Sequence, residues 1–514
     1  MPAAEYVPLQ FEPGVWKNGT LYQARGRWYD ADLMRWSVGA LGPVGGWRPW
    51  GENTTAVTGV GRTALPWMDN TFRRWIAVGT AAKLYVYDSA ADLSDITPSG
   101  FTAGRTDANP NIGYGNAVYG QSTYGDPRPD LGIPEPATIW SFDLWGENLV
   151  GCTPEDGDVY MWDASTATPA TTVAARIANS PQFAIATAVT SERIQMVFGG
   201  TPSGGAEADR DRRRVFWSDS EDNTYWTTSS PNQAGDQILD TEGDLLGAVK
   251  VRDRLLIFTT IDAHLATYVG LPYVYSFDRV GDACGPVCIN AVAVAGPTAY
   301  WMGRSAQGFF KYDGSLQSIP CDVESFLVTD MNQAQASKVV AWHNTLFNEV
   351  VWFYPSSTIE VDAYVAYNYV EEHWSTGTLA RTAVTSRGIF LQPIMFDVDG
   401  NPYEHEVGNT YTDIGGTAKV PYVESGPIEL GNGDRVLSAT SLIPDVTSLG
   451  DITTTFYTRL YPTDSDTTHG PYTMAAPTSV RFTGRTCRMK CTSDSSAAWN
   501  VGVPRLEMQP GGRR

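Results

Sequence analysis

The histidines and cysteines are the side chains of this sequence best suited to bind a metal. The five histidines have neither an H-E-x-x-H nor a His-x-His spacing, so they predict no zinc helix and no facial triad. Two cysteine pairs have three intervening residues, Cys284 with Cys288 and Cys487 with Cys491. That spacing lies in the loose range for zinc, but alternation along a strand places both sulfurs of the second pair on one face, which favours burial. We therefore predict no metal site and six reduced cysteines.

Groups that could activate a substrate are also sparse. The sequence contains no G-x-x-x-x-G-K-[ST] phosphate loop and no G-x-S-x-G nucleophile elbow. Paired carboxylates such as Glu371 with Glu372 could act as acid and base on a glycan, because that chemistry uses two carboxyl groups. A catalytic site needs convergent groups, and the sequence is poor in them. We predict no catalytic residue and no cofactor, and we expect that the protein is not an enzyme.

The composition is that of a folded, acidic protein. The 514 residues include 36 Lys or Arg and 57 Asp or Glu, which gives a formal charge of −21. A hydrophobic share of 42% and an aromatic share of 12% exclude a disordered polyanion, because such chains are poor in aromatics. The negative charge argues against gripping a nucleic-acid backbone. Apolar stretches such as Leu255–Phe258 are far too short to cross a bilayer as a helix.

The elements that would position any site follow a repeated pattern of short strand, polar turn and strand with a terminal aromatic residue. The pattern occurs at residues 74–88, 143–163, 299–314 and 348–374. Recurring four-strand units of roughly 40–50 residues are typical of radial sheet repetition. We therefore predict an all-β protein with an irregular β-propeller of six or seven blades over residues 55–410. The alternative is a stack of unrelated β-sandwiches.

Two regions stand outside the repeat. Residues 1–54 are dense in arginine and tryptophan with little periodicity, and they predict an N-terminal arm or platform segment that lies over another surface. Within it, Trp28, Arg35 and Trp36 are candidates to anchor the arm or to contact a partner. Residues 411–514 contain segments that alternate like sandwich strands, and they predict a separate C-terminal β-sandwich domain.

A Gly/Tyr-rich insertion interrupts the propeller at about residues 100–135. Glycine and polar residues cannot build a core there, yet Tyr114, Tyr119 and Tyr124 are spaced by five and offer large amphipathic contact areas. Two interpretations are open at this point: a flexible loop, or a loop that contacts a partner.

Several segments together resemble the tail nozzle or hub proteins of short-tailed bacteriophages, which are also called packaged-DNA stabilisation proteins. The similarity is one of pattern over most of the chain. The segments that carry it are Gly281–Gly285, Thr298–Gly314, Asp322–Ala336, Glu349–Tyr354, Val365–Asn368 with Trp374, the opening Pro13–Thr20 with Arg27–Asp30 and Gly45–Trp47, and the close Trp499–Leu506 with Pro510–Arg513.

The resemblance implies a virion structural protein that forms a ring-shaped DNA conduit below the portal and adaptor. In this interpretation a hexameric ring of propellers surrounds a channel, and a β-sandwich platform grips the adaptor. The ring retains the packaged genome and passes it at ejection, and duplex DNA slides through without sequence-specific binding. Tail fibres or spikes and a needle or plug are further expected partners.

The expected location is the phage tail, after synthesis in the host cytoplasm. The first residues have neither the basic start nor the apolar core of a secretory signal. The alternative function is a glycan-binding or receptor-binding propeller at the tail tip, with aromatic residues that stack on sugars.

Overall fold

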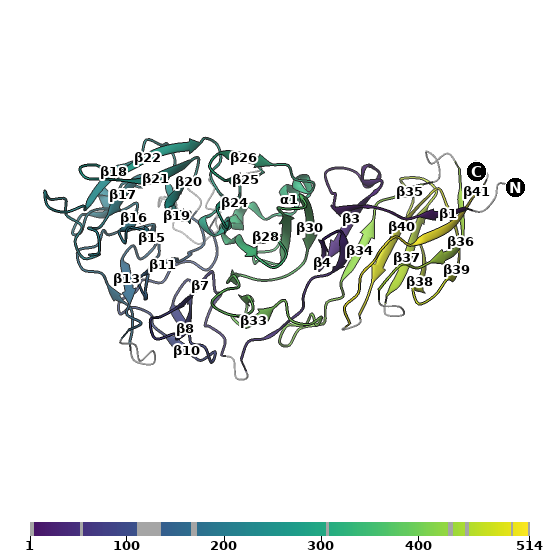
Figure 1. The fold of residues 1–514 in the computed structure, drawn as a ribbon, viewed down its shortest axis with the longest axis horizontal. Coiled ribbons are helices and arrows are strands. Elements are labelled where there is room, and N and C mark those ends of the chain that lie inside the picture. Colours follow the sequence, from purple (N-terminus) through teal and green to yellow (C-terminus); the bar gives the residue numbers. More distant parts are fainter. Residues whose placement is uncertain are drawn as a thin grey trace, which may run out of the picture.

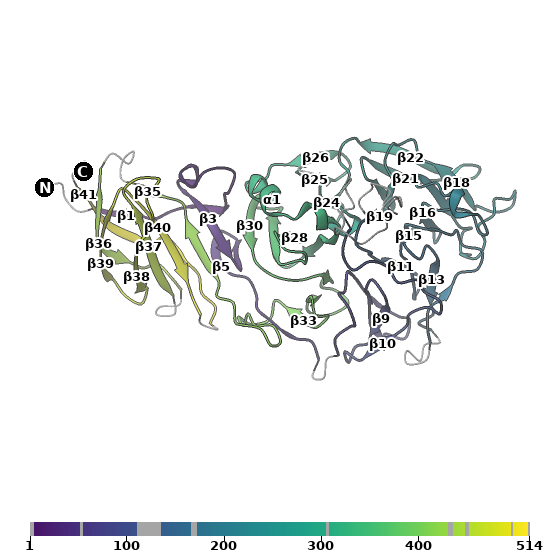
Figure 2. The same cartoon turned by 180° about the vertical axis from the view of Figure 1, so that it is seen from behind.

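The computed structural model describes residues 5–51, 55–109, 135–165, 172–304, 308–429, 435–447, 452–494 and 497–511. The molecule is elongated, with a propeller at one end and a β-sandwich at the other (Figure 1). Both chain ends lie at the far end of the sandwich, and the view from behind shows the same arrangement (Figure 2). Tyr114, Tyr119 and Tyr124 fall outside the described residues.

Seven four-stranded antiparallel sheets within the described residues form the blades of the propeller. Blade 1 contains β7 (Thr63–Met68), β8 (Arg74–Gly79), β9 (Leu84–Tyr87) and β10 (Leu93–Asp95), and blade 2 contains β11 (Ser141–Trp145), β12 (Asn148–Cys152), β13 (Val159–Trp162) and β14 (Ala175–Arg176). Blade 3 contains β15 (Ala186–Val189), β16 (Gln195–Phe198), β17 (Arg214–Trp217) and β18 (Gly235–Ile238), and blade 4 contains β19 (Leu245–Val251), β20 (Arg254–Thr259), β21 (Ala263–Gly270) and β22 (Val274–Gly281).

The chain continues through three more blades to complete the ring. Blade 5 contains β23 (Val292–Ala295), β24 (Thr298–Met302), β25 (Phe309–Tyr312) and β26 (Leu316–Ile319), and blade 6 contains β27 (Val340–Asn344), β28 (Glu349–Tyr354), β29 (Ala363–Asn368) and β30 (His373–Gly377). Blade 7 contains β31 (Ala383–Val384), β32 (Ile394–Phe396), β33 (Pro402–His405) and, from the N-terminal segment, β6 (Trp47–Pro49). The predicted fold class, a propeller with a β-sandwich, is confirmed.

The ring closes through contacts between the first strands of its blades, and a strand from the N-terminal segment holds its outer side. The first strand of each blade contacts the first strand of the next, and β31 of blade 7 returns to contact β7 of blade 1. On the outer side β6 pairs with β33, with Trp47 opposite His405 and Arg48 opposite Glu404. A propeller whose first and last blades are held by such a strand does not depend on inner contacts alone.

Many of the blade strands are buried on both faces, because each sheet packs between two neighbouring blades. β28 is buried along its whole length, since both of its faces pack against other blades. Aromatic residues fill the space between successive sheets. Between blades 1 and 2, the ring of Trp162 lies edge-on to those of Trp67 and Trp75 at 6.1 and 5.3 Å.

Helices are few and short, and they lie in connections. They are η1 (Leu21–Ala24), η2 (Glu207–Asp209), η3 (Ile289–Ala291), α1 (Glu324–Asp330) and η4 (Gln333–Lys338). In the described part of the chain, none of them has the length and apolar character that a membrane crossing requires.

The sandwich is built from both ends of the chain. One sheet has the order β1 (Glu5–Pro8), β41 (Arg505–Pro510), β36 (Leu437–Ile443) and β39 (Thr478–Gly484). The other has the order β2 (Glu12–Val15), β3 (Arg27–Asp32), β34 (Tyr422–Ser425), β40 (Thr486–Thr492), β37 (Thr453–Arg459) and β38 (Thr467–Thr473), with β35 (Ile428–Glu429) also paired to β40.

The N-terminal segment thus belongs to both domains. Its first three strands complete the sandwich, β6 completes blade 7, and a hairpin of β4 (Met34–Ser37) and β5 (Ala40–Pro43) lies between them. Residues 5–49 therefore run from the far end of the sandwich to the rim of the propeller (Figure 1).

Candidate functional site at the domain junction

The propeller and the sandwich share one hydrophobic core. Trp28 on β3 and Trp36 on β4 are buried in the same cluster as Trp374 of blade 6 and Phe456 of the sandwich. The rings of Trp28 and Trp36 are 6.4 Å apart, and the ring of Trp36 meets that of His373 edge-on at 6.0 Å. Because apolar contacts run through the junction, the two domains are packed together as parts of one fold.

The N-terminal segment approaches blade 6 closely at Gly14. This glycine has a φ of +89°, and a Cβ added there would lie 2.8 Å from the Cβ of His373. Glycine therefore serves two needs at this position, the left-handed backbone and the close approach.

Hydrogen bonds on either side of the shared core fix how the two domains are oriented at the junction. The Arg27 guanidinium donates to Asp322 at 2.7 Å, in the connection between blades 5 and 6. The backbone N–H and side-chain hydroxyl of Thr378 donate to Asp32 at 2.7 and 2.9 Å. These bonds tie β3 of the sandwich to the propeller at two separate places.

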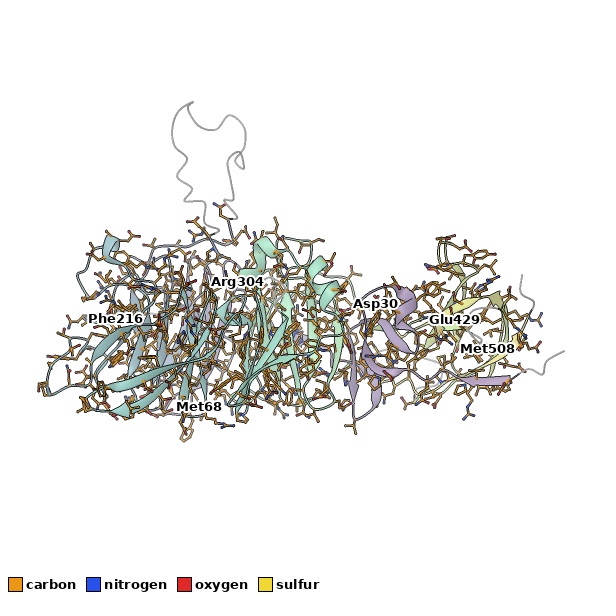
Figure 3. The ribbon with its side chains drawn as sticks, turned by 90° about the horizontal axis from the view of Figure 1, so that it is seen from above. Asp30, Met68, Phe216, Arg304, Glu429 and Met508 are labelled. Carbon is orange, nitrogen blue, oxygen red and sulfur yellow. The ribbon has the colours of Figure 1, made fainter. Side chains whose placement is uncertain are left out.

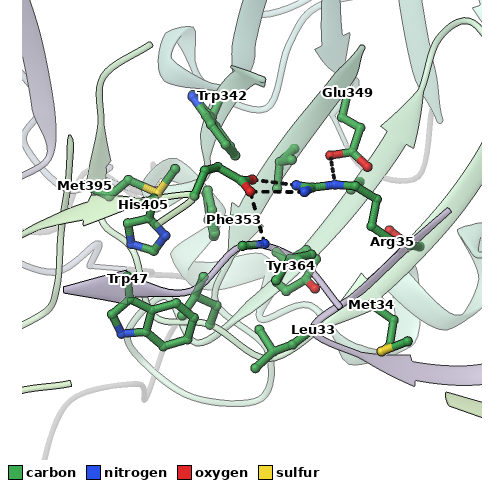
Figure 4. A pocket seen from close by; sticks show the side chains of 17 residues that line it. Leu33, Met34, Arg35, Trp47, Trp342, Glu349, Phe353, Tyr364, Met395 and His405 are labelled. Atoms are coloured by element: carbon green, nitrogen blue, oxygen red, sulfur yellow. Dashed lines mark hydrogen bonds and ion pairs between the residues drawn. The ribbon is translucent and has the colours of Figure 1, made fainter. Parts of the chain in front are cut away.

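A buried ion triad lies beside the β4–β5 hairpin (Figure 4). The Nε of Arg35 donates to Glu349 at 2.8 Å, and its Nη2 and Nη1 donate to Glu406 at 2.6 and 3.2 Å. Glu406 also accepts from the backbone of Gly45 at 3.0 Å and from the amide of Asn344 at 2.9 Å. The triad joins the N-terminal segment to blade 6 and to the end of blade 7.

Burial controls the protonation of this triad. Burial raises the pKa of Glu349 to about 7, because desolvation and the neighbouring Glu406 outweigh the attraction of Arg35. Burial alone would lower the pKa of Arg35, but the two carboxylates raise it above its usual value. Arg35 is therefore permanently charged, and Glu349 changes its charge near neutral pH.

A cavity of about 40 Å³ lies next to the triad and is lined by Trp47, Trp342, Phe353, Tyr364, His405 and neighbouring residues (Figure 4). Burial and the nearby Arg381 hold the pKa of His405 well below its usual value, so this imidazole is neutral. A cavity of this size holds a few water molecules, whereas ligand pockets are about ten times larger. The arrangement can hold charge and water, but it has no room for a substrate of ordinary size.

The sandwich carries a much larger cleft, of about 1040 Å³. It lies between the two sheets and is lined largely by hydroxyl, charged and imidazole groups of β36, β37, β38 and β39. His469 in the cleft contacts the hydroxyl of Thr458 at 2.9 Å and stacks on Phe482 at 5.2 Å. Because β38 and β39 are edge strands of their sheets, the cleft lies beside unpaired strand edges.

The structure describes three of the six residues that the sequence analysis singled out as possible partner contacts. Trp28, Arg35 and Trp36 are buried inside this chain, where they join the N-terminal segment to the propeller. Sequence reasoning missed Glu349 and Glu406, the partners of Arg35. The available signal was one carboxylate at the head of an otherwise apolar strand, Glu349 in β28.

The cysteines lie in apolar surroundings. Cys487 and Cys491 are both buried on one face of β40, as the alternation predicted. Burial raises the pKa of Cys487 to about 12 and that of Cys491 to about 11, so both are protonated thiols at neutral pH. Among the described residues, no cluster of three or more His, Cys, Asp or Glu side chains could hold a metal ion.

No family profile and no curated protein matches the sequence. Among solved structures, the chain is similar to a streptogramin B lyase with a TM-score of 0.40 at 8% identity, over 70% of this chain and 96% of that one. A fungal alcohol oxidase gives a TM-score of 0.40 at 10% identity, over 91% and 100%. A prolyl endopeptidase gives 0.35 at 12% identity, over 71% and 54%.

These comparisons correct one expectation. The sequence led us to expect that the protein is not an enzyme, yet the solved structures with a similar fold are named as enzymes. At these TM-scores and identities, the likeness assigns no reaction or residue to this chain.

Proposed function

We propose that the protein is a virion structural protein, a tail nozzle or hub that forms a ring-shaped DNA conduit below the portal and adaptor of a short-tailed phage. The observation that carries this proposal is the fusion of propeller and sandwich into one elongated unit through a shared core and a buried ion triad. A ring that holds a pressurised genome needs protomers that transmit load without bending between their domains.

The negative net charge of the chain supports a channel through which DNA passes. Each copy has a formal charge of −21. In a ring of several copies an acidic wall would repel the phosphate backbone, so duplex DNA would slide without adhering.

The sandwich supports attachment to a neighbouring tail protein. Its cleft lies beside the edge strands β38 and β39, and unpaired strand edges are where a partner can add a strand. In the proposed ring the sandwich faces the adaptor, and the propellers of neighbouring copies surround the channel.

The proposal is tested by electron microscopy of single particles of the purified full chain, alone and mixed with portal–adaptor complexes. We expect six-fold rings with an axial hole, formed on the adaptor. Isolated discs that remain apart from the adaptor under every condition would contradict the proposal.

A second candidate is a glycan-binding protein at the tail tip. The cleft of about 1040 Å³ favours it, because hydroxyl, imidazole and guanidinium groups of Ser, Thr, His and Arg line a space large enough for an oligosaccharide. Saturable binding on a glycan array, lost in the cleft variant Arg481→Ala, would support this function, and an array without binding would exclude it.

A further inference from the structure

The short helix η3 lies over the centre of the propeller. It leads into blade 5, yet the side-chain amide of Asn290 donates to the backbone oxygen of Arg62 at 2.9 Å. The same amide also reaches the hydroxyl of Thr63, at 3.0 Å, where blade 1 begins. Blades 1 and 5 are not neighbours in the ring of seven, so these groups meet over the middle of the ring.

The same helix contacts blades 4 and 6, on either side of blade 5. A Cβ added to Gly247 of β19 would lie 3.0 Å from the Cγ1 of Ile289, so this side chain lies directly on the first strand of blade 4. The indole N–H of Trp352 in β28 donates to the backbone oxygen of Ala291 at 2.9 Å. The three residues of η3 thus contact blades 1, 4 and 6.

The helix η4, between blades 5 and 6, bonds to the connection between blades 1 and 2. The side-chain amide of Gln335 donates to the backbone oxygen of Ala108 at 2.9 Å, and its oxygen accepts from the backbone N–H of the same residue at 2.9 Å. The backbone N–H of Ala137 donates to the hydroxyl of Ser337 at 3.0 Å. Because the two connections belong to opposite sides of the ring, these bonds also span its centre.

Buried ion pairs hold these connections together. The side chain of Lys338 is 0% exposed, and its ammonium donates to Asp107 at 2.6 Å and to Glu360 at 2.8 Å. Its third bond goes to the backbone oxygen of Ile359 at 2.8 Å. The guanidinium of Arg62 donates to both oxygens of Glu360, at 2.8 and 2.7 Å. Two cations and two carboxylates therefore alternate, and each buried ion has a partner.

Cys288 joins the two helices. It directly precedes η3, and its thiol donates to the backbone oxygen of Val339, the residue after η4, at 3.1 Å. This cysteine is 4% exposed. Burial raises the pKa of its thiol to about 12, so it is an unreactive thiol as long as η3 and η4 cover it.

These connections lie on one axial face of the propeller. Met68 is the last residue of β7, and Figure 3 shows it on the face opposite Arg304. The first strand of blade 1 therefore begins on the face of Arg304. The backbone N–H of Arg304 donates to Gly285, in the connection that precedes blade 5, at 3.0 Å. A propeller surrounds a central channel, and η3 and η4 lie where this channel would open on that face.

We propose that η3 and η4, bonded to residues 106–108, form a cap that closes the central channel of the propeller on this face. No ligand then enters the propeller along its axis from this side. The cap does not rest on the proposed function, because it belongs to the single chain. In the proposed ring, a consequence that does rest on that function is that DNA passes between copies and not along the axis of one propeller.

The test is native-state labelling of the full chain with iodoacetamide, followed by mass spectrometry of the cysteine peptides. All six cysteines are buried, so those of the wild type should react slowly. Lys338→Met leaves two carboxylates with one cation, and Gln335→Ala removes both bonds to the backbone of Ala108. Each change should open the cap locally and speed the labelling of Cys288 by about tenfold or more.

The controls separate opening of the cap from unfolding of the chain. Cys487 and Cys491 in the sandwich should keep their wild-type rates in both variants. Lys83→Met and Gln317→Ala change exposed side chains of blades 1 and 5 and should leave Cys288 protected. Gln335→Ala is the milder cap variant, so the test does not depend on how Lys338→Met folds.

Three results would overturn the proposal. The first is fast labelling of Cys288 in the wild type, which would mean that the cap is open. The second is a wild-type rate of Cys288 in both cap variants. The third is a rate of Cys288 that rises only together with those of Cys487 and Cys491, which would mean that the whole chain unfolds.

Discussion

At the residue scale, the buried triad of Arg35, Glu349 and Glu406 is costly to form but specific. Taking charges out of water costs several kcal/mol per ion, and the cost is recovered only if every charge has partners. Here the guanidinium has hydrogen bonds to both carboxylates, and Glu406 has two further donors. The triad therefore specifies one position of the β4–β5 hairpin more than it adds stability.

The raised pKa of Glu349 predicts a pH dependence of stability. In the unfolded chain this carboxyl ionises near its ordinary pKa of 4.5, whereas the folded protein keeps the proton until about 7. The folded state binds more protons between these values, so stability falls as pH rises through this window and levels off above it.

The variant Glu349→Gln lacks this titration. Between about pH 5 and pH 8, its free energy of unfolding should rise relative to that of the wild type, by roughly 3 kcal/mol at most. Urea unfolding at both pH values measures this difference. The control Glu242→Gln changes an exposed carboxyl and should follow the wild type, and a parallel pH profile for Glu349→Gln would disprove the assignment.

At the element scale, β6 is the strand that closes the propeller. Only three residues long, it is held by Trp47, which is 2% exposed and stacks on His405 at 5.3 Å. The guanidinium of Arg381 lies 5.1 Å from the same ring, and Tyr411 meets it edge-on. The closure of blade 7 therefore depends on one large side chain.

Replacing Trp47 should destabilise the propeller locally, where blade 7 closes the ring. Trp47→Ala is expected to cost about 3–5 kcal/mol, as truncations of large buried aromatics do. Amide hydrogen exchange should increase in β33 and β7, and remain unchanged in β16 of blade 3. The control Arg48→Ala affects an exposed residue of the same strand and should cost less than about 1 kcal/mol. Faster exchange in all blades would contradict local closure.

At the scale of the whole molecule, the N-terminal segment joins the propeller to the sandwich. Without it, the two domains would only lie next to each other. It contributes three strands to the sandwich and one to the propeller, and Trp28 and Trp36 lie in the core between them. Contacts of this kind couple the stabilities of two domains, because neither can unfold without exposing the shared core.

We therefore expect a single calorimetric unfolding transition for the wild type. Trp36→Ala removes a side chain that is 2% exposed at the junction, and it should split this transition into two, with a loss of about 3–5 kcal/mol. The control Val38→Ala changes the 93% exposed tip of the same hairpin and should keep one transition. Two transitions in the wild type would show that the domains are independent.

Sequence patterns alone predict the class of the fold and many of its strands. The predicted unit at residues 74–88 contains β8 and β9, the one at 143–163 contains β12 and β13, and the one at 299–314 overlaps β24 and contains β25. These predictions succeed because alternation of apolar residues and the chemistry of turns are local properties.

The number of blades, the origin of the sandwich strands and the site at the junction are apparent only in the folded molecule. Blade 7 needs β6, whose Arg48 pairs with Glu404, and the sandwich needs β1, whose Glu5 pairs with Met508. Arg35 likewise meets Glu349 and Glu406 across separations of 314 and 371 residues. Pairings over such separations leave no periodic signal in either segment, because they depend on the geometry of everything folded between them.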